Sequence, residues 1–172
     1  MNNKVLTVTF DDKPIGIDSK ENVHKFGKLH RAFSVFIFNS KNQILLQKRA
    51  ESKYHSGGLW SNACCSHPIT ENIVFEAENR LEEELGFSCK LEEKLSFVYY
   101  SELDNQNVEF EFDHVLVGNS NIKIEKIKFN KVEASEVRWV DIDWLKNDIS
   151  ANPSNYTKWF IIGLSLLNKD LY

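Results

Sequence analysis

Glu109 and Glu111 are the residues of this 172-residue chain whose spacing most directly suggests chemistry. They alternate with phenylalanines in the run Val108-Glu-Phe-Glu-Phe112, a pattern typical of a β-strand. Side chains two residues apart on a strand point to the same face, so the two carboxylates should lie together. Burying them is costly unless they bind something, and the pattern therefore predicts a bound cation. Phe110 and Phe112 should face the opposite side and enter the core.

Three of the five histidines, His24, His30 and His67, are candidate partners of these glutamates. Neutral imidazoles together with carboxylates suit a divalent ion such as Mn, Zn or one resembling Mg. The alternative for any single histidine is a surface residue or a core residue with satisfied hydrogen bonds. Only the set of five residues predicts a metal site.

Composition narrows the class of protein. The chain is 42% hydrophobic and 27% charged with a net charge of −4, which is ordinary for a globular protein and gives no reason to expect a nucleic-acid partner. Three cysteines, of which Cys64 and Cys65 are adjacent, fit a reducing compartment better than a disulfide framework. The N-terminus lacks signal-peptide features, and no apolar run approaches the roughly 20 residues of a membrane span. We therefore expect a cytoplasmic protein with no membrane partner.

The elements that must position these residues follow from periodicity and turn residues. Strands are expected at 5–10, 31–38, 43–47, 95–100, 108–117 and 136–140, with hairpins joining the first strand to the turn after it and 31–38 to 43–47. Apolar residues at four-residue spacing predict a helix over 72–85 that ends at Gly86, and further helices are expected at 143–147 and 156–171. Surface loops are expected at 49–60 and 104–107. This order predicts an α/β (α+β) fold, a mixed sheet covered by helices, in a single domain over 1–172.

Two sets of motifs carry a resemblance to a known family. The segment from Cys65 through Glu71 to Leu81-Glu-Glu-Glu-Leu-Gly-Phe87 resembles the Nudix box, but Asn79-Arg80 stands where the diphosphate hydrolases of that superfamily carry Arg-Glu. Cys65 also stands where they carry Gly. The three motifs that agree with one another, in chain order, are Leu29-His-Arg-Ala-Phe-Ser34, Trp60-Ser-Asn-Ala-Cys-Cys-Ser-His-Pro68 and Val108-Glu-Phe-Glu-Phe112. Together they resemble type I isopentenyl diphosphate isomerase over nearly the whole chain.

The resemblance implies a fold, a reaction and a set of cofactors. The expected fold is the Nudix-type mixed sheet sandwiched by helices. The expected reaction interconverts isopentenyl and dimethylallyl diphosphate in isoprenoid biosynthesis, by adding a proton to an alkene and removing another from the neighbouring carbon. The expected cofactors are Mn or Zn at the His/Glu site and Mg with the substrate diphosphate, with neither flavin nor NAD(P). No glycine fingerprint for a dinucleotide is present, which agrees with this expectation.

The resemblance also assigns roles to residues. Cys65 and Glu111 match the catalytic pair, and Tyr99 is expected to assist Glu111. Cys64 is expected to point away and to act as a small core residue. The expected metal ligands are His24, His30, His67, Glu109 and Glu111. The expected diphosphate ligands are Lys20, Arg49, Lys53 and Arg80, with Glu84 for Mg²⁺ and Trp159 for the cationic reaction centre.

Several alternatives stay open at the level of sequence. The chain could be a Nudix hydrolase of a nucleoside diphosphate derivative, or a catalytically silent metal-binding or interaction domain with the same fold. Arg80 and Glu84 could form a simple surface ion pair, and Trp159 could be a core residue. The reach of His24 to the metal, the order of acid and base within the catalytic pair, the metal actually bound and the oligomeric state are not decided by these residues.

Overall fold

A computed structural model describes residues 3–103 and 107–169 of the chain. Residues 104–106 of the predicted loop at 104–107 therefore lie outside the described residues. The helices and strands are β1 (Lys4–Val8), β2 (Pro14–Ser19), α1 (Lys20–Phe26), β3 (His30–Phe38), β4 (Gln43–Arg49), β5 (Trp60–Ser61), β6 (Cys64–Ser66), α2 (Ile73–Leu85), β7 (Leu91–Glu102), β8 (Val108–Asn119), η2 (Ile124–Lys126), β9 (Ala134–Asp141), α3 (Ile142–Ala151), η3 (Pro153–Asn155) and α4 (Lys158–Lys169).

Strand β3 is the centre of the sheet. It runs parallel to β8 along its whole length, from His30 opposite Glu111 to Phe38 opposite Asn119. The antiparallel strand β6 pairs with its other edge, and β8 pairs in turn with β7. Because β3 is covered on both faces, its sequence is a nearly continuous apolar run. The mixed sheet predicted from the order of elements is confirmed.

The predicted hairpin between residues 31–38 and 43–47 is wrong in its pairing. Both strands exist, but they share one matched pair, Phe38 with Ile44, and then diverge. Strand β4 pairs along its length with β9 instead. A short polar turn between two apolar runs favours a hairpin only when no better partner is available, and here more distant strands provide the pairing. The opening hairpin of β1 and β2 does form as expected.

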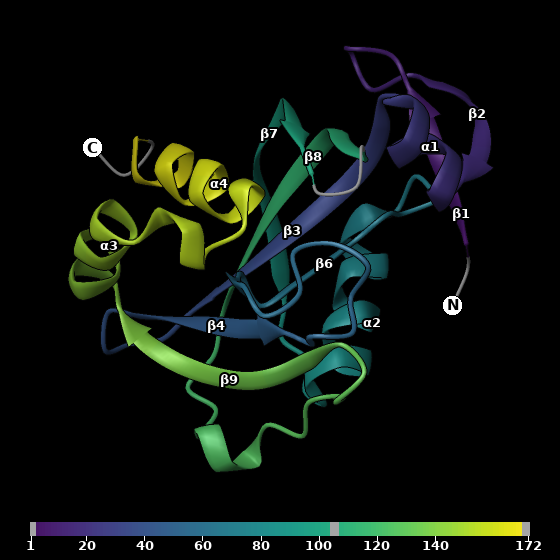
Figure 1. Cartoon of the computed structure of the whole chain (residues 1–172). Helices are drawn as coiled ribbons and strands as arrows, with labels where there is room; N and C mark the ends of the chain where they lie inside the picture. Colours follow the sequence, from purple (N-terminus) through teal and green to yellow (C-terminus); the bar gives the residue numbers. More distant parts are fainter. Residues whose placement is uncertain (1–2, 104–106, 170–172) are drawn as a thin grey trace.

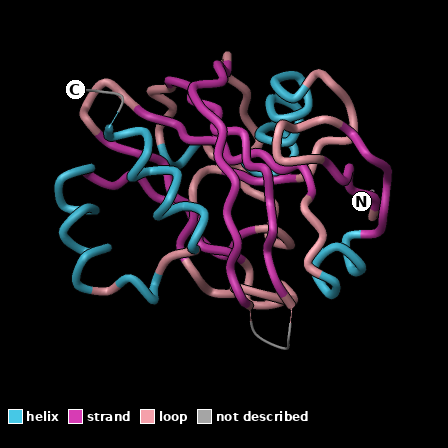
Figure 2. The backbone as a smooth tube through the Cα atoms, turned by 90° about the horizontal axis from the view of Figure 1, so that it is seen from above, coloured by secondary structure: helices cyan, strands magenta, loops and turns pink. Residues whose placement is uncertain are grey.

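Helices cover both faces of the sheet, as Figures 1 and 2 show. Helix α2 packs Ala77, Leu81 and Leu85 against the β3 side chains that face it. Helices α3 and α4 lie together on the other side, where Phe160 and Leu164 join a second apolar cluster. The predicted helix over 72–85 is confirmed within one residue, and it ends where Gly86 adopts the left-handed conformation at φ 70°.

Helix α1 was not predicted from the sequence. It is only seven residues long and begins with Ser19, whose side chain accepts a hydrogen bond from the Asn22 backbone N–H. A helix this short shows too few turns for apolar periodicity to be recognised. Its position matters for function because it buries His24 against β8 and places Lys20 beside it.

The prediction that Phe110 and Phe112 enter the core is wrong. Both are only half-buried, and Phe110 packs edge-on against the exposed rings of Phe10 and Tyr100. The opposite face of β8 is the buried one, and it carries Glu109 and Glu111. The alternation of β8 was correct, but the carboxylates occupy its interior face and the phenylalanines its outer face.

The stability of the α2 side of the core can be tested with Leu81. Its side chain is fully buried, so we expect Leu81→Ala to lower the free energy of unfolding by about 2–5 kcal/mol. Urea denaturation of metal-free protein measures the change. Phe75→Ala is the control, because Phe75 lies on the same helix with 57% of its surface exposed and should cost far less. Equal losses in the two variants would contradict the packing described here.

Among the described residues, no helix is both long and apolar enough to cross a membrane.

Candidate metal and substrate site

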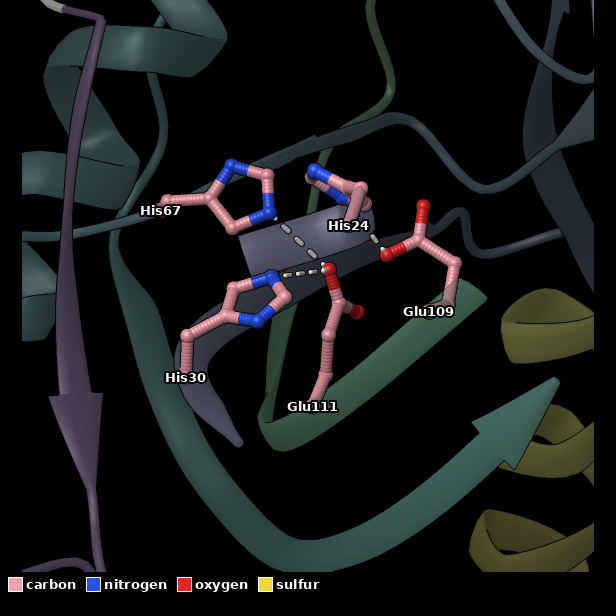
Figure 3. Close-up of side chains that lie close together, drawn as sticks. All are labelled: His24, His30, His67, Glu109 and Glu111. Atoms are coloured by element: carbon pink, nitrogen blue, oxygen red, sulfur yellow. Dashed lines mark hydrogen bonds and ion pairs between the residues drawn. The ribbon is translucent and has the colours of Figure 1, made fainter. Parts of the chain in front are cut away.

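Five of the predicted metal ligands meet at one end of β3 and β8. His30 begins β3 and faces Glu111 across the parallel pair, while His24 comes from α1 and His67 follows β6. One potential ligand atom from each of these residues and Glu109 lies within 4.8 Å of all the others. Figure 3 shows the three imidazoles and two carboxylates facing a common space. His24 therefore lies close enough to the other four residues to share a metal ion with them.

The hydrogen bonds of the histidines prepare them for a cation. The Nδ1 of His24 lies 2.5 Å from the Lys20 carbonyl, and the Nδ1 of His30 lies 2.8 Å from the Lys28 carbonyl. Since a carbonyl only accepts, each Nδ1 carries a proton, which leaves the Nε2 atoms of both rings to face the carboxylates. Burial lowers the pKa of His24 and lowers that of His67 to about 3, which keeps both rings neutral.

The two carboxylates face the Nε2 atoms of these rings at short distance. His24 Nε2 is 3.0 Å from Glu109 Oε2, and His30 Nε2, which has no hydrogen-bond partner, is 3.5 Å from Glu111 Oε1. Burial and the charge of Glu111 raise the pKa of Glu109 well above its usual range, so this carboxyl tends to take up a proton unless another cation balances its charge. Acceptors that face acceptors in a buried site are unfavourable unless a cation lies among them. The residues present therefore fit a divalent ion bound by nitrogen and oxygen.

Tyr99 contacts Glu111 as the resemblance implied. Its hydroxyl on β7 donates to Glu111 Oε2 over 2.6 Å, while His67 Nε2 lies 2.9 Å from Glu111 Oε1. The two residues are directly opposite each other on the antiparallel strands β7 and β8. Burial and the charge of Glu111 raise the pKa of Tyr99 well above its usual range, so the phenol stays protonated as a donor.

Cys65 has a defined orientation. Asn62 donates from Nδ2 to the Val35 and Cys64 carbonyls, at 3.1 and 2.8 Å, which turns its Oδ1 toward Cys65. The Cys65 thiol donates to that oxygen over 3.2 Å, and Ser34 Oγ lies 3.7 Å away on the other strand. Burial raises the pKa of Cys65 to about 12. Cys64 points to the opposite face and is fully buried in the cluster under α2, as predicted.

Two connected cavities adjoin these groups. The outer one, of about 660 Å³, is lined by all four predicted diphosphate ligands, and these are Lys20, Arg49, Lys53 and Arg80. The inner one, of about 50 Å³, is lined by Cys65, Glu111 and Trp159. Lys20, Arg49 and Cys65 line both. The site thus combines an outer cavity, lined by five cations and four glutamates, with a small inner recess lined by Cys65 and Glu111.

The cations of the outer cavity are held by buried acids. Arg80 contacts Glu84 over 2.7 Å and Glu133 over 3.0 Å, and Lys53 also binds Glu133. Glu84 is only 3% exposed and also accepts a hydrogen bond from Gln47, so the pair of Arg80 and Glu84 is not a simple surface ion pair. Burial raises the pKa of Glu84, although Arg80 opposes the shift.

Trp159 belongs both to the core and to the site. It is 5% exposed within the α4 cluster, and its indole N–H donates to Ser61 Oγ over 3.1 Å. The Arg49 guanidinium lies 5.2 Å from its ring centroid. Trp159 is therefore both a core residue and a lining residue of the inner recess, so the two interpretations made from the sequence are compatible.

Sequence reasoning missed four polar residues of the site. Ser34 and Asn62 contact Cys65, Glu133 binds two of the cations, and His55 lies 3.2 Å from Glu109. Ser34 and Asn62 stand inside the quoted motifs, so their positions were available as a signal. His55 and Glu133 lie in irregular segments, where periodicity assigns no face.

Comparison with known proteins identifies relatives over most of the chain. The family model for the NUDIX domain matches residues 28–160. Isopentenyl-diphosphate Delta-isomerase 1 of Aromatoleum aromaticum is 46% identical over 92% of this chain and 89% of its own length. Isopentenyl-diphosphate Delta-isomerase 2 of Photorhabdus laumondii is 43% identical over 96% of this chain and 94% of its own.

Solved structures agree on the fold. A Deinococcus radiodurans protein superposes with a TM-score of 0.69 at 20% identity, over 87% of this chain and 90% of its own. A MutT protein of Methanosarcina mazei does so with a TM-score of 0.64 at 17% identity, over 83% and 94%. At these identities the likeness concerns the fold alone, and it confirms the predicted Nudix-type architecture.

Proposed function

The chain belongs to the NUDIX family and, within it, to the isopentenyl-diphosphate Delta-isomerases, and from this membership we propose that it interconverts isopentenyl and dimethylallyl diphosphate. The observation that carries the proposal is the pairing of two chambers. The outer cavity adjoins a recess in which Cys65 and Glu111 line one space. In this proposal the diphosphate occupies the first cavity, and the short hydrocarbon chain of the substrate enters the second.

The diphosphate is the part of the substrate that Lys20, Arg49, Lys53 and Arg80 bind in this proposal. Two of these cations already share Glu133, which fixes their positions before substrate arrives. The net charge of −4 means that attraction of an anion depends on this local cluster rather than on the whole protein. Glu84, in the same cavity, is the proposed ligand for Mg²⁺ that accompanies the diphosphate.

The reaction needs one proton added to the alkene and one removed from the neighbouring carbon. We assign these transfers to Cys65 and Glu111, with Tyr99 holding Glu111 in position through its 2.6 Å hydrogen bond. Between the two proton transfers, the substrate carries positive charge and resembles a tertiary carbocation. A Trp159 ring within about 6 Å of that charge would stabilise it by about 1–2 kcal/mol.

The His/Glu group is the proposed site of a Mn or Zn ion held by His24, His30, His67, Glu109 and Glu111. When bound, such an ion supplies positive charge that stabilises the Glu111 carboxylate and acidifies protons near it. The chain's own residues orient this site, because backbone carbonyls hold the rings of His24 and His30.

Removal of the metal is expected to lower turnover by about 10²-fold or more, since several kcal/mol of charge stabilisation are lost. Protein is dialysed against a chelator, and its metal content is followed by atomic spectroscopy. Mn²⁺ or Zn²⁺ should restore turnover at about one ion per chain. A protein shown to be metal-free that keeps its turnover with Mg²⁺ and substrate would contradict the proposed site.

The function itself is tested by proton NMR of the purified protein with isopentenyl diphosphate and Mg²⁺ in D₂O, without flavin. Dimethylallyl diphosphate that carries deuterium supports the isomerase. Untouched substrate, together with phosphate release from a nucleoside diphosphate derivative, would instead support a Nudix hydrolase. If neither substrate reacts, the result would support the alternative of a catalytically silent metal-binding domain.

We further propose that the protein acts in the cytoplasm on this small-molecule diphosphate.

A further inference from the structure

Among the described residues, His55 lies outside the five-ligand group, and its side chain contacts Oε1 of Glu109, the oxygen that does not face His24. Glu109 directs Oε2 to His24 at 3.0 Å and Oε1 to His55 Nε2 at 3.2 Å. Both side chains of the second contact are only 4% exposed, so water cannot readily replace it. The carboxylate is thus held from both sides.

The surroundings of His55 allow its Nε2 to carry a proton. Its Nδ1 lies 3.3 Å from the Ser56 hydroxyl, which can donate a hydrogen to it. When the Ser56 hydroxyl donates to Nδ1, the neutral ring carries its proton at Nε2, and this N–H lies 3.2 Å from Glu109 Oε1. This arrangement gives Glu109 a neutral donor, in contrast to the lone pair that His24 presents.

The backbone of the loop around His55 has little conformational freedom. Ser56 adopts a left-handed φ of 50° and Gly58 one of 74°, and a Cβ on Gly57 would lie 2.7 Å from the Glu51 carbonyl oxygen. Arg49 donates to the His55 carbonyl at 3.3 Å and to the Ser56 carbonyl at 3.1 Å. Arg49 therefore uses two of its N–H groups to hold the loop that carries His55.

The ring of His55 neighbours both a metal-ligand histidine and Trp159. Its centroid is 5.8 Å from that of His24 and 6.1 Å from that of Trp159, and its side chain lines the recess. Tyr54 packs edge-on against it at 4.3 Å. The contact of His55 with Glu109 is therefore fixed by packing as well as by hydrogen bonds.

We propose that His55 is a positioning residue for the metal site, which donates to Glu109 Oε1 and thereby holds Oε2 of this ligand toward the ion. This inference rests on the metal site of the proposed function. Carboxylates that bind a metal are themselves held by hydrogen bonds, and loss of such a partner weakens metal affinity by about 10- to 100-fold.

The test is a titration of metal-free protein with Mn²⁺ alone, followed by calorimetry. Expected results are a dissociation constant about 10- to 100-fold higher for His55→Leu, which keeps apolar bulk, and recovery of most of this loss in His55→Gln, whose amide can donate. His114→Gln is the matched control, because His114 bonds Asp12 and Glu93 away from the site. Urea denaturation of each metal-free variant shows whether the fold is retained.

The outcomes separate this inference from the metal site on which it depends. Unchanged affinity in His55→Leu would overturn the inference, and so would a His55→Gln variant as weak as His55→Leu or a His114→Gln variant that is equally weakened. Failure of the metal site itself has a different signature, namely wild-type protein that takes up no Mn²⁺ and is indistinguishable from His67→Ala.

Discussion

Glu111→Gln is expected to lower the turnover number for isomerisation by about 10²- to 10⁴-fold, the usual contribution of a positioned acid or base. Glutamine has the same size and can still contact Tyr99 and His67, which now bond the two carboxylate oxygens at 2.6 and 2.9 Å. It cannot exchange a proton at neutral pH. Geometry is therefore largely kept while the chemistry is removed.

Because Glu111 is also a proposed metal ligand, the measurement must separate the two roles. Steady-state kinetics are measured beside the metal content of each variant, and turnover is compared per metal-loaded chain. Glu92→Gln, an exposed residue of β7, serves as the control and should behave as wild type. A Glu111→Gln variant that holds its metal and turns over within tenfold of wild type would remove Glu111 from the catalytic pair.

Cys65→Ala is expected to cause a loss of similar size, about 10²- to 10⁴-fold in turnover, because the second proton then has no group to carry it. The Cys65 thiol is oriented by Asn62 Oδ1 at 3.2 Å and lines the same recess as Glu111. Substrate binding should change little, since the proposed diphosphate ligands are untouched. The measurement is deuterium incorporation into dimethylallyl diphosphate in D₂O.

The adjacent cysteine offers a matched control for this variant. Cys64→Ala removes a thiol one residue away, but Cys64 points into the core under α2 and should leave turnover near the wild-type value. If both variants lost activity equally, the effect would reflect packing of β6 rather than chemistry. If neither did, Cys65 would have no catalytic role.

Much of the fold was predictable because local patterns agreed with the tertiary structure. The four-residue apolar spacing that ends at Gly86 located α2, and the alternation of 108–117 located β8. The extent of pairing between β3 and β4 was predicted wrongly. Strand β3 pairs along its length with β8, which lies about eighty residues further along the chain. Local turn chemistry carries no information on such a distant competitor. Helix α1 was missed because seven residues show too little periodicity.

The candidate site divides in the same way. Spacing alone indicated that Glu109 and Glu111 share one face, because strand period is fixed by covalent geometry. The resemblance to a known family selected His24, His30 and His67 from the five histidines, and their donor chemistry agreed with a metal site. Which face of β8 is buried was decided only by tertiary packing, which placed the glutamates inside and Phe110 outside. The same is true of His55, whose position depends on a loop held by Arg49 and Gly57. Contacts made by irregular segments leave no periodic trace in a sequence, and the folded chain alone brings them together.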